Sequence, residues 1–155
     1  MPNIAYILGY GRLANFIVNQ PKRIMPQYGK FIKKGINQPL SSVPFHSKAP
    51  IKRLSMLSRT LIPQAKMHIA VHFVSAKGKP IPEYSKLHKH NFDEINLILS
   101  EDSRLAYEVQ LEDEIYRVSS PSTIFIPKNT RHRAKVLSGK GIFVCIIKSS
   151  KYKSR

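Results

Sequence analysis

The sequence of 155 residues contains no tryptophan and only one cysteine, Cys145. A single cysteine excludes an internal disulfide and a zinc site built from several cysteines. Cys145 lies in the apolar run 142–147, so we interpret it as a small buried hydrophobic residue. No run of ~18 uncharged apolar residues occurs, so no membrane-spanning helix is expected. Residues 4–8 are too short for the core of a secretory signal, and together these absences favour a cytoplasmic protein.

Acidic residues are absent from the first half of the chain. The protein has 26 Lys and Arg residues against nine Asp and Glu, a formal net charge of +17. The first acidic residue is Glu83, and residues 1–80 carry 13 of the basic residues. A basic segment without acids can be an organelle transit peptide, an arm that contacts nucleic acid or anionic membranes, or a solvated surface. We favour the solvated surface.

From residue 67 onward, the sequence alternates between apolar and polar residues, as β-strands do. In residues 67–74, the side chains of Ile69, Val71 and Phe73 share one face, and those of His68, Ala70 and His72 share the other. Further strands are expected near 85–90, 94–100, 104–111, 114–119, 122–126, 131–137 and 141–148. Many short strands joined by tight turns predict an antiparallel sandwich or a closed barrel.

The residues before 67 show no such pattern. Residues 4–18 are apolar but interrupted by glycine and asparagine, so they indicate neither a helix nor a strand. Residues 51–61 place apolar side chains at 51, 54, 57 and 61, which predicts a short helix. We therefore divide the chain into a basic extension at 1–66 that packs on the barrel or a partner subunit, a barrel at 67–148, and a basic tail at 149–155.

The most distinctive motif is formed by His88, His90 and Glu94. Residues at i and i+2 on a strand point to the same face, so the two histidines can bind one ion. A straight strand would carry Glu94 about 13 Å from His90, because each residue adds about 3.3 Å. The chain must therefore bend between them, and Asn91 and Asp93 are residues that favour turns. We expect Glu94 to open the next strand and to face the histidines.

A third histidine, His132, follows Pro127 by five residues. It shares one face of its predicted strand with Ala134 and Val136, while the opposite face is basic, so His132 should point inward. Three imidazoles and one carboxylate suit a divalent transition metal (Fe, Mn, Zn, Ni, Cu or Co) rather than calcium or magnesium. The ligand types leave two possibilities open, a six-coordinate metal with free positions and a closed tetrahedral zinc.

These motifs resemble those of the cupin superfamily, small jelly-roll β-barrels with an internal metal. The first cupin motif is a glycine, five residues, His-x-His, three or four residues, Glu, six residues and a glycine. His88, His90 and Glu94 match its ligand positions, whereas Pro82 and Glu101 stand in place of the two glycines. The resemblance therefore keeps the ligands of the first motif and loses its flanking glycines.

The second cupin motif is a glycine, five residues, Pro-x-Gly, two residues, His, three residues and Asn. Pro127 and His132 match, and Pro121, Asn129 and Val136 replace the other positions. Asparagine tolerates a left-handed backbone better than other non-glycine residues, so Asn129 is a mild replacement. The resemblance covers residues 67–148. It predicts an all-β, cupin-type jelly-roll β-barrel with a basic N-terminal extension of loops and helix.

Several other residues are weaker candidates for the site. Asn96 shares the Glu94 face and could orient a ligand, and Tyr84 and His72 could reach a substrate. His68 and His72 could line the barrel, although a solvent-facing position is the commoner situation and is the one we expect. Asp93 is expected to be a turn or supporting residue rather than a ligand, and His46, in a predicted loop, is given no role. The catalytic residues stay unassigned.

The resemblance alone does not assign a reaction, because cupins include dioxygenases, decarboxylases, isomerases, lyases and binding proteins. Our first hypothesis is a metal-dependent enzyme of dioxygenase, lyase or isomerase type, acting on a small anionic or chelating substrate that the positive protein attracts. The alternative is a non-catalytic sensor or binding module whose basic N-terminal region contacts nucleic acid or a protein. We also expect a homodimer, because small cupins typically pair through barrel faces.

Overall fold

The computed structural model describes residues 28–76, 78–102 and 104–150. This part of the chain consists mainly of antiparallel strands, with two short 3-10 turns near its start. The turns are η1 (Gly29–Phe31) and η2 (Leu40–Ser42). The strands are β1 (Ile36–Asn37), β2 (Lys52–Leu57), β3 (His68–Ser75), β4 (Glu94–Leu99), β5 (Ala106–Leu111), β6 (Glu114–Ser119), β7 (Ser122–Ile126), β8 (His132–Ser138) and β9 (Lys140–Ile147).

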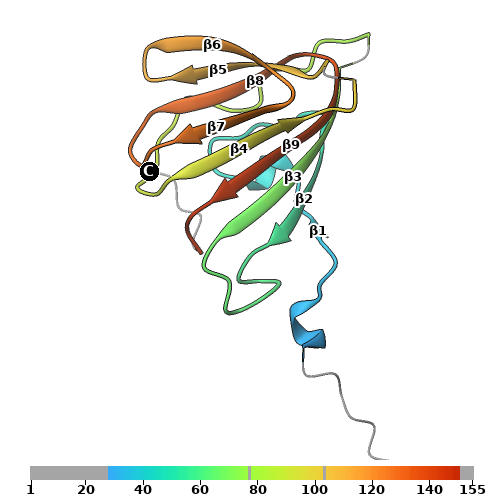
Figure 1. Cartoon of the computed structure of the whole chain (residues 1–155), viewed down its shortest axis with the longest axis vertical. Coiled ribbons are helices and arrows are strands. Elements are labelled where there is room, and N and C mark those ends of the chain that lie inside the picture. The colour runs from blue at the N-terminus through green and yellow to red at the C-terminus, as the bar shows by residue number, and fades with distance from the viewer. Residues whose placement is uncertain (1–27, 77, 103, 151–155) are drawn as a thin grey trace, which may run out of the picture.

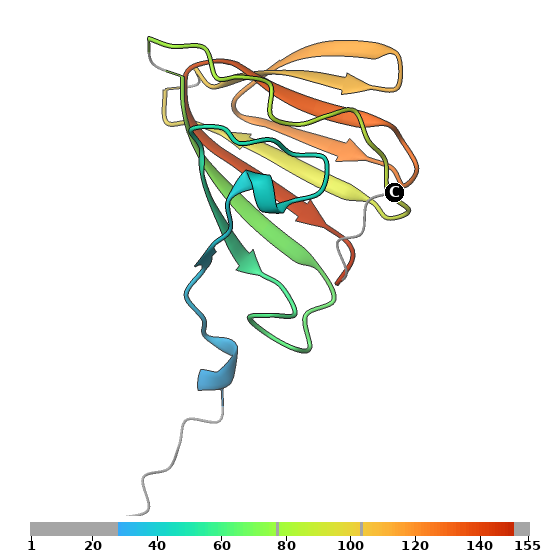
Figure 2. The same ribbon diagram turned by 180° about the vertical axis from the view of Figure 1, so that it is seen from behind.

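The strands form two sheets that face each other (Figures 1 and 2). One has six strands in the order β1-β2-β3-β9-β4-β7, and the other has three in the order β6-β5-β8. Isolated bridges between His88 and His132 and between His46 and Ser85 continue the pairing beyond β8. All the strands pair antiparallel to their neighbours, so the fold is the all-β architecture that the alternating pattern predicted.

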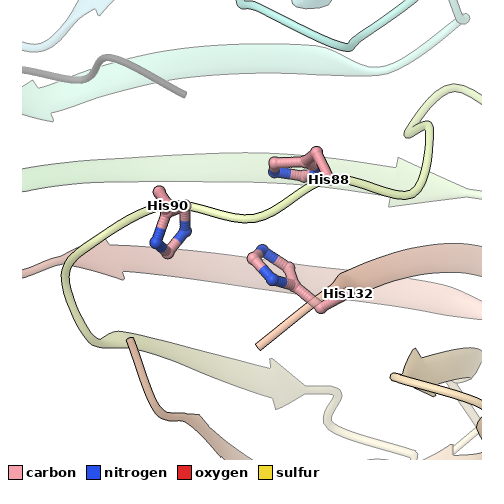
Figure 3. A group of neighbouring side chains, drawn as sticks. All are labelled: His88, His90 and His132. Atoms are coloured by element: carbon pink, nitrogen blue, oxygen red, sulfur yellow. The ribbon is translucent and has the colours of Figure 1, made fainter. Parts of the chain in front are cut away.

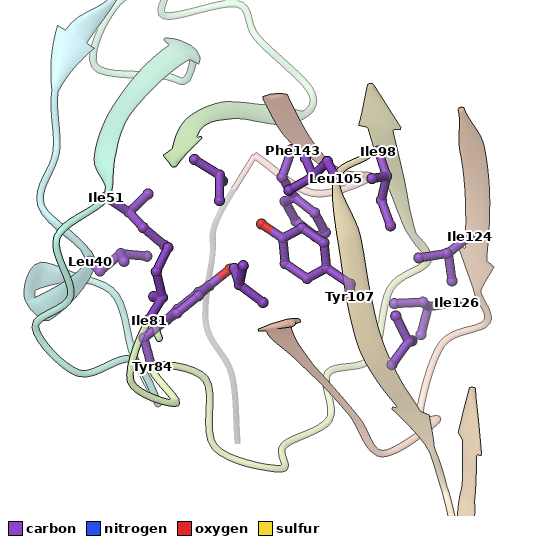
Figure 4. Packing of buried hydrophobic residues seen from close by; sticks show 13 residues of the cluster. Leu40, Ile51, Ile81, Tyr84, Ile98, Leu105, Tyr107, Ile124, Ile126 and Phe143 are labelled. Carbon is purple, nitrogen blue, oxygen red and sulfur yellow. The ribbon is translucent and has the colours of Figure 1, made fainter. Parts of the chain in front are cut away.

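The hydrophobic core lies between the two sheets (Figure 4). Ile98 of β4 and Tyr107 of β5 are completely buried, and so is Leu105 just before β5. The Tyr107 ring packs against Phe143 of β9 with 4.8 Å between ring centroids, which joins one sheet to the other. Burying a side chain of this size contributes about 1.5–3 kcal/mol, so a few such contacts hold the sheets together.

Strand β3 faces the interior with a more polar set of side chains than we expected. His68, Ala70, His72 and Val74 are buried, whereas the alternate residues of β3 face outward. The prediction that His68 and His72 face solvent is therefore wrong. The aliphatic face of β3 lies outside, and the two imidazoles are buried beside polar groups of β2.

Residues 51–61 do not form the predicted helix. They contain strand β2, in which Arg53 and Ser55 point inward and are almost completely buried. Because the buried positions 53 and 55 are polar, the strand lacks the usual alternation of buried apolar residues. The remaining apolar residues at 51, 54, 57 and 61 have the spacing of a helix. Arg53 is accommodated there by hydrogen bonds to His72, His68 and Gln38, a set of partners that the local sequence does not reveal.

The predicted strand at 85–90 is also wrong in part. Ser85 pairs with His46 and His88 pairs with His132, so the segment changes partner and forms no continuous ladder. The other predicted strands lie within about two residues of the observed ones. Residues 4–18 and most of the 149–155 tail lie outside the described residues. In the described part, no helix has the length and apolar character needed to cross a membrane.

Candidate metal centre

The backbone fixes His88 directly opposite His132. The His88 N–H donates to the His132 carbonyl at 3.1 Å, and the His132 N–H donates to the His88 carbonyl at 2.8 Å. Such a reciprocal pair holds two residues side by side with their side chains on one face. The two imidazole centroids are 4.5 Å apart.

His90 is positioned by the turn that precedes β8. The Asn129 N–H donates to the His90 carbonyl at 2.7 Å, and Asn129 has φ of +67°. This left-handed conformation is the one that the sequence suggested for the asparagine in place of glycine. The chain then bends at residues 91–92 and enters β4 at Glu94, whose side chain is buried.

Asp93 supports this bend from its outer side. Its carboxylate accepts the Lys128 backbone N–H at 3.1 Å and pairs with Lys148 Nζ at 3.0 Å. It is the turn residue that the sequence indicated.

Each of the three histidines has its Nδ1 atom beside a backbone carbonyl two residues away. The distances from Nδ1 are 2.8 Å to Lys86 O for His88, 2.7 Å to Phe92 O for His90 and 2.9 Å to Thr130 O for His132. A carbonyl can only accept, so each Nδ1 carries the proton. In the neutral imidazole the lone pair is then on Nε2, which is the arrangement that metal-binding histidines use.

The three histidines converge on one small volume (Figure 3). One ligand nitrogen from each of His88, His90 and His132 lies within 4.8 Å of the other two, and all three residues are buried. The Nε2 atoms of His88 and His132 have no hydrogen-bond partner among the described residues. His90 Nε2 lies 2.9 Å from Glu94 Oε2. A lone pair that faces a carboxylate oxygen requires a proton or a metal ion between them, so the donor set fits a cation.

The two oxygens of Glu94 have different surroundings. Oε1 accepts from Asn96 Nδ2 at 2.7 Å and from Cys145 Sγ at 3.3 Å. Oε2 lies 2.9 Å from His90 Nε2 and 3.6 Å from His132 Nε2. Burial alone would raise the pKa of Glu94, but the contacts with His132, His90 and Asn96 hold it well below its usual range. The carboxylate is therefore ionised, with one oxygen directed to the histidines.

The histidines differ in their proton affinity. Burial lowers the pKa of His88 to about 4, so this imidazole is neutral at pH 7 with its lone pair available. Burial also opposes protonation of His132, but its contacts with Glu94 raise the pKa above the ordinary value. A cation bound at this point would compete with a proton for the Nε2 atom of His132.

A small cavity of about 40 Å³, partly open to solvent, adjoins the cluster. That volume accommodates about three water-sized groups. Its lining includes His88, Glu94 and His132 together with His46, His72, Tyr84, Ser85, Asn96, Ala134, Phe143 and Cys145.

The structure thus brings His88, His90, His132 and Glu94 together, and it places Asn96 against Glu94 and Tyr84 and His72 in the cavity wall. Sequence reasoning missed three other residues near the cluster, Cys145, His46 and Arg53. Cys145 pairs with Asn96 in the β4–β9 register, so strand parity could have identified it. No sequence signal indicated His46 or Arg53.

No protein-family model matches the sequence, and no curated protein matches it. Solved structures do match. The polyketide cyclase RemF from Streptomyces resistomycificus is similar with a TM-score of 0.55 and 15% identity, over 85% of this chain and 84% of that protein. A cupin 2 domain-containing protein from Halorhodospira halophila has a TM-score of 0.53 and 15% identity, over 71% and 83%.

A third similar structure is a cupin 2 conserved barrel domain protein from Rhodopseudomonas palustris. It has a TM-score of 0.52 and 15% identity, over 79% of this chain and 85% of that one. Identities this low indicate a shared fold without indicating a shared activity. The cupin resemblance of the two histidine motifs is confirmed at the level of the fold, and this chain has the cupin jelly-roll fold.

Proposed function

We propose that this protein is a metal-binding cupin in which His88, His90, His132 and Glu94 hold one divalent transition metal. The observation that carries the proposal is the direction of the lone pairs. Three backbone carbonyls accept hydrogen bonds from the Nδ1–H groups, which leaves the Nε2 lone pairs available to a metal. The Nε2 atoms of His90 and His132 lie 2.9 and 3.6 Å from Glu94 Oε2. Nitrogen donors with one carboxylate select iron, manganese, cobalt, nickel, copper or zinc.

We further propose that the protein is an enzyme acting on a small anionic or chelating substrate, by dioxygenase, lyase or isomerase chemistry. The metal would supply Lewis acidity, or activation of dioxygen, toward a bound carboxylate or keto acid. The chain's own residues fix the site. Asn96 and Cys145 hold one oxygen of Glu94.

The buried charges support an anionic substrate. Apart from the histidines, Arg53 and Glu94 are the two side chains in the described part of the chain that are buried and charged at neutral pH. Their charges cancel, so a divalent ion would leave the barrel interior with a net charge of about +2. An anion that enters the cavity would reduce this charge, whereas a cation would increase it.

The metal content of purified protein tests the proposal. The wild type should carry about one transition metal per chain, and the double substitution His90→Ala, His132→Ala should carry almost none, because it removes two of four donors. His46→Ala is the matched control, since His46 lies near the cluster but is not one of the three grouped histidines. Equal metal content in the wild type and the double variant would refute metal binding at this site.

The role of Glu94 can be tested separately. In Glu94→Gln, an amide replaces the carboxylate, so Oε1 can still accept from Asn96 while the charge and the anionic donor are lost. We expect the affinity for zinc or cobalt to fall at least about tenfold, with the fold retained. Unchanged affinity would remove Glu94 from the ligand set and leave the three histidines in it.

We also propose that the protein forms a homodimer through the outer face of the six-stranded sheet. On the central strands β3, β9 and β4 this face is aliphatic and aromatic. It consists of Ile69, Val71, Phe73, Ile142, Val144, Ile146, Ile95, Leu97 and Leu99, aligned in neighbouring rows. These three rows contain no charged residue, so contact between two copies there would bury no charged side chain of the rows.

Sedimentation at micromolar concentration tests the dimer. Val144→Lys places a charge at the centre of the face and should give a monomer, because the lysine would be buried against an apolar partner. Ile115→Lys on β6 is the control, since Ile115 is 60% exposed on the other sheet. A monomeric wild type, or a dimer that tolerates Val144→Lys, would contradict this interface.

A further inference from the structure

His72 is held by a buried arginine on the neighbouring strand. Arg53 of β2 is paired in register with His72 of β3, and Arg53 is only 4% exposed. Its Nε donates to His72 Nε2 at 3.0 Å. A guanidinium can only donate, so Nε2 of His72 must be the acceptor.

This contact fixes the proton of His72 on the other ring nitrogen. A neutral imidazole that accepts through Nε2 carries its hydrogen on Nδ1. The Nδ1 atom of His72 is buried and has no hydrogen-bond partner among the described residues. A buried donor without an acceptor is destabilising, and proteins retain few of them. Arg53 therefore makes the Nδ1–H of His72 a buried hydrogen-bond donor that has no acceptor among the described residues.

His72 also lies beside the candidate metal centre. It lines the same small cavity as His88, Glu94 and His132, and it is 4% exposed. Its ring stacks on Phe143 at a centroid distance of 5.5 Å and meets Tyr84 edge-on at 6.2 Å. These contacts restrict rotation of the imidazole, so the direction of its N–H is fixed before a ligand arrives.

We propose that the Nδ1–H of His72 donates a hydrogen bond to an oxygen of the ligand bound at the metal, and that this ligand is a small carboxylate. The inference rests on the proposed metal site and extends it to the substrate. Arg53 is the positioning residue, because it selects the tautomer without touching the ligand. The cavity volume of about 40 Å³ favours a small ligand, and oxalate is a small carboxylate suited as a probe.

The chain contains a matched control for this idea. His68 lies four residues earlier on the same inward face of β3, and its Nε2 lies 3.3 Å from another nitrogen of Arg53. His68 is buried like His72 but is not part of the cavity lining. A change at either histidine disturbs Arg53, whereas only a change at His72 removes the proposed donor.

Binding of oxalate to the cobalt-loaded full-length protein, followed by visible absorption, tests the proposal. His72→Phe keeps a neutral ring but removes the donor, so oxalate should bind at least about tenfold more weakly, which corresponds to the loss of one hydrogen bond. His68→Phe should bind within about threefold of the wild type. His72→Asn restores an N–H at the distance of Nδ1 from the backbone and should recover part of the affinity. Cobalt content should be equal in all four proteins.

A measurement on the wild type keeps the test valid if a variant does not fold. In the zinc-loaded protein, ¹⁵N-edited spectra should show His72 protonated on Nδ1, and oxalate should shift this signal while leaving that of His68 in place. An unshifted His72 signal, or equal weakening of oxalate binding in the two phenylalanine variants, would overturn the proposed role of His72. Either result would leave the proposed metal site standing. A wild type that takes up neither metal would overturn the proposed metal site, and this inference with it.

Discussion

Acid should destabilise the metal-free protein through His72. Burial, together with the positive charge of Arg53 and the proximity of His46, lowers the pKa of His72 from 6.5 to about 3, against a smaller opposing effect of Glu94. The imidazole of the unfolded chain has its ordinary pKa, so between these two values the unfolded state binds the extra proton. Stability from this residue is complete above about pH 6.5 and is lost as the pH falls toward 3.

The size of the effect follows from the pKa difference. Each unit of separation between the pH and 6.5 costs about 1.4 kcal/mol while the folded imidazole stays neutral. At about pH 4.5 the loss is therefore about 3 kcal/mol. Domains of this kind have about 5–15 kcal/mol of stability in total, so a loss of this size is readily measured.

Urea unfolding with a chelator present, at about pH 7.5 and pH 4.5, is the appropriate assay. His72→Gln is the comparison, because glutamine offers an oxygen to Arg53 but does not titrate. All other acid-sensitive groups are common to both proteins, so the difference between their losses isolates His72. Between these two pH values, the free energy of unfolding of the wild type should fall by about 3 kcal/mol more than that of the variant. Losses that agree within about 1 kcal/mol would refute the assignment of His72 as a buried neutral imidazole.

Substitutions at three further positions test the surroundings of the site. Asn96→Leu removes a donor to Glu94 and should weaken zinc binding about 10- to 100-fold in a competition assay; unchanged affinity would contradict its orienting role. Arg53→Met removes the donor to His72 and should cost about 2–5 kcal/mol in urea unfolding, whereas a cost below about 1 kcal/mol would argue against a structural role. Asn129→Gly should be nearly neutral and Asn129→Val should cost about 1–2 kcal/mol, because valine resists a positive φ; equal stabilities would be inconsistent with the left-handed turn.

Much of the strand pattern and the position of the histidine cluster could be predicted from the sequence. The spacing of His88, His90 and Glu94 indicated a shared site with a bend, and the parity of β8 directed His132 inward independently. Both arguments use the alternation of a strand, in which neighbouring residues face opposite sides, so they depend only on residues close together in the sequence. The prediction failed for 51–61, where the buried face is polar and the apolar spacing imitates a helix.

The donors themselves, and the left-handed turn at Asn129, follow from the sequence by itself, because they depend on residue type and local spacing. The tertiary structure alone decided what surrounds them. Arg53 and His72 are 19 residues apart and meet only because β2 pairs with β3. Cys145 reaches Glu94 across 51 residues of chain. Such contacts depend on which strands become neighbours, and strand pairing is settled by the packing of the whole barrel rather than by any local pattern.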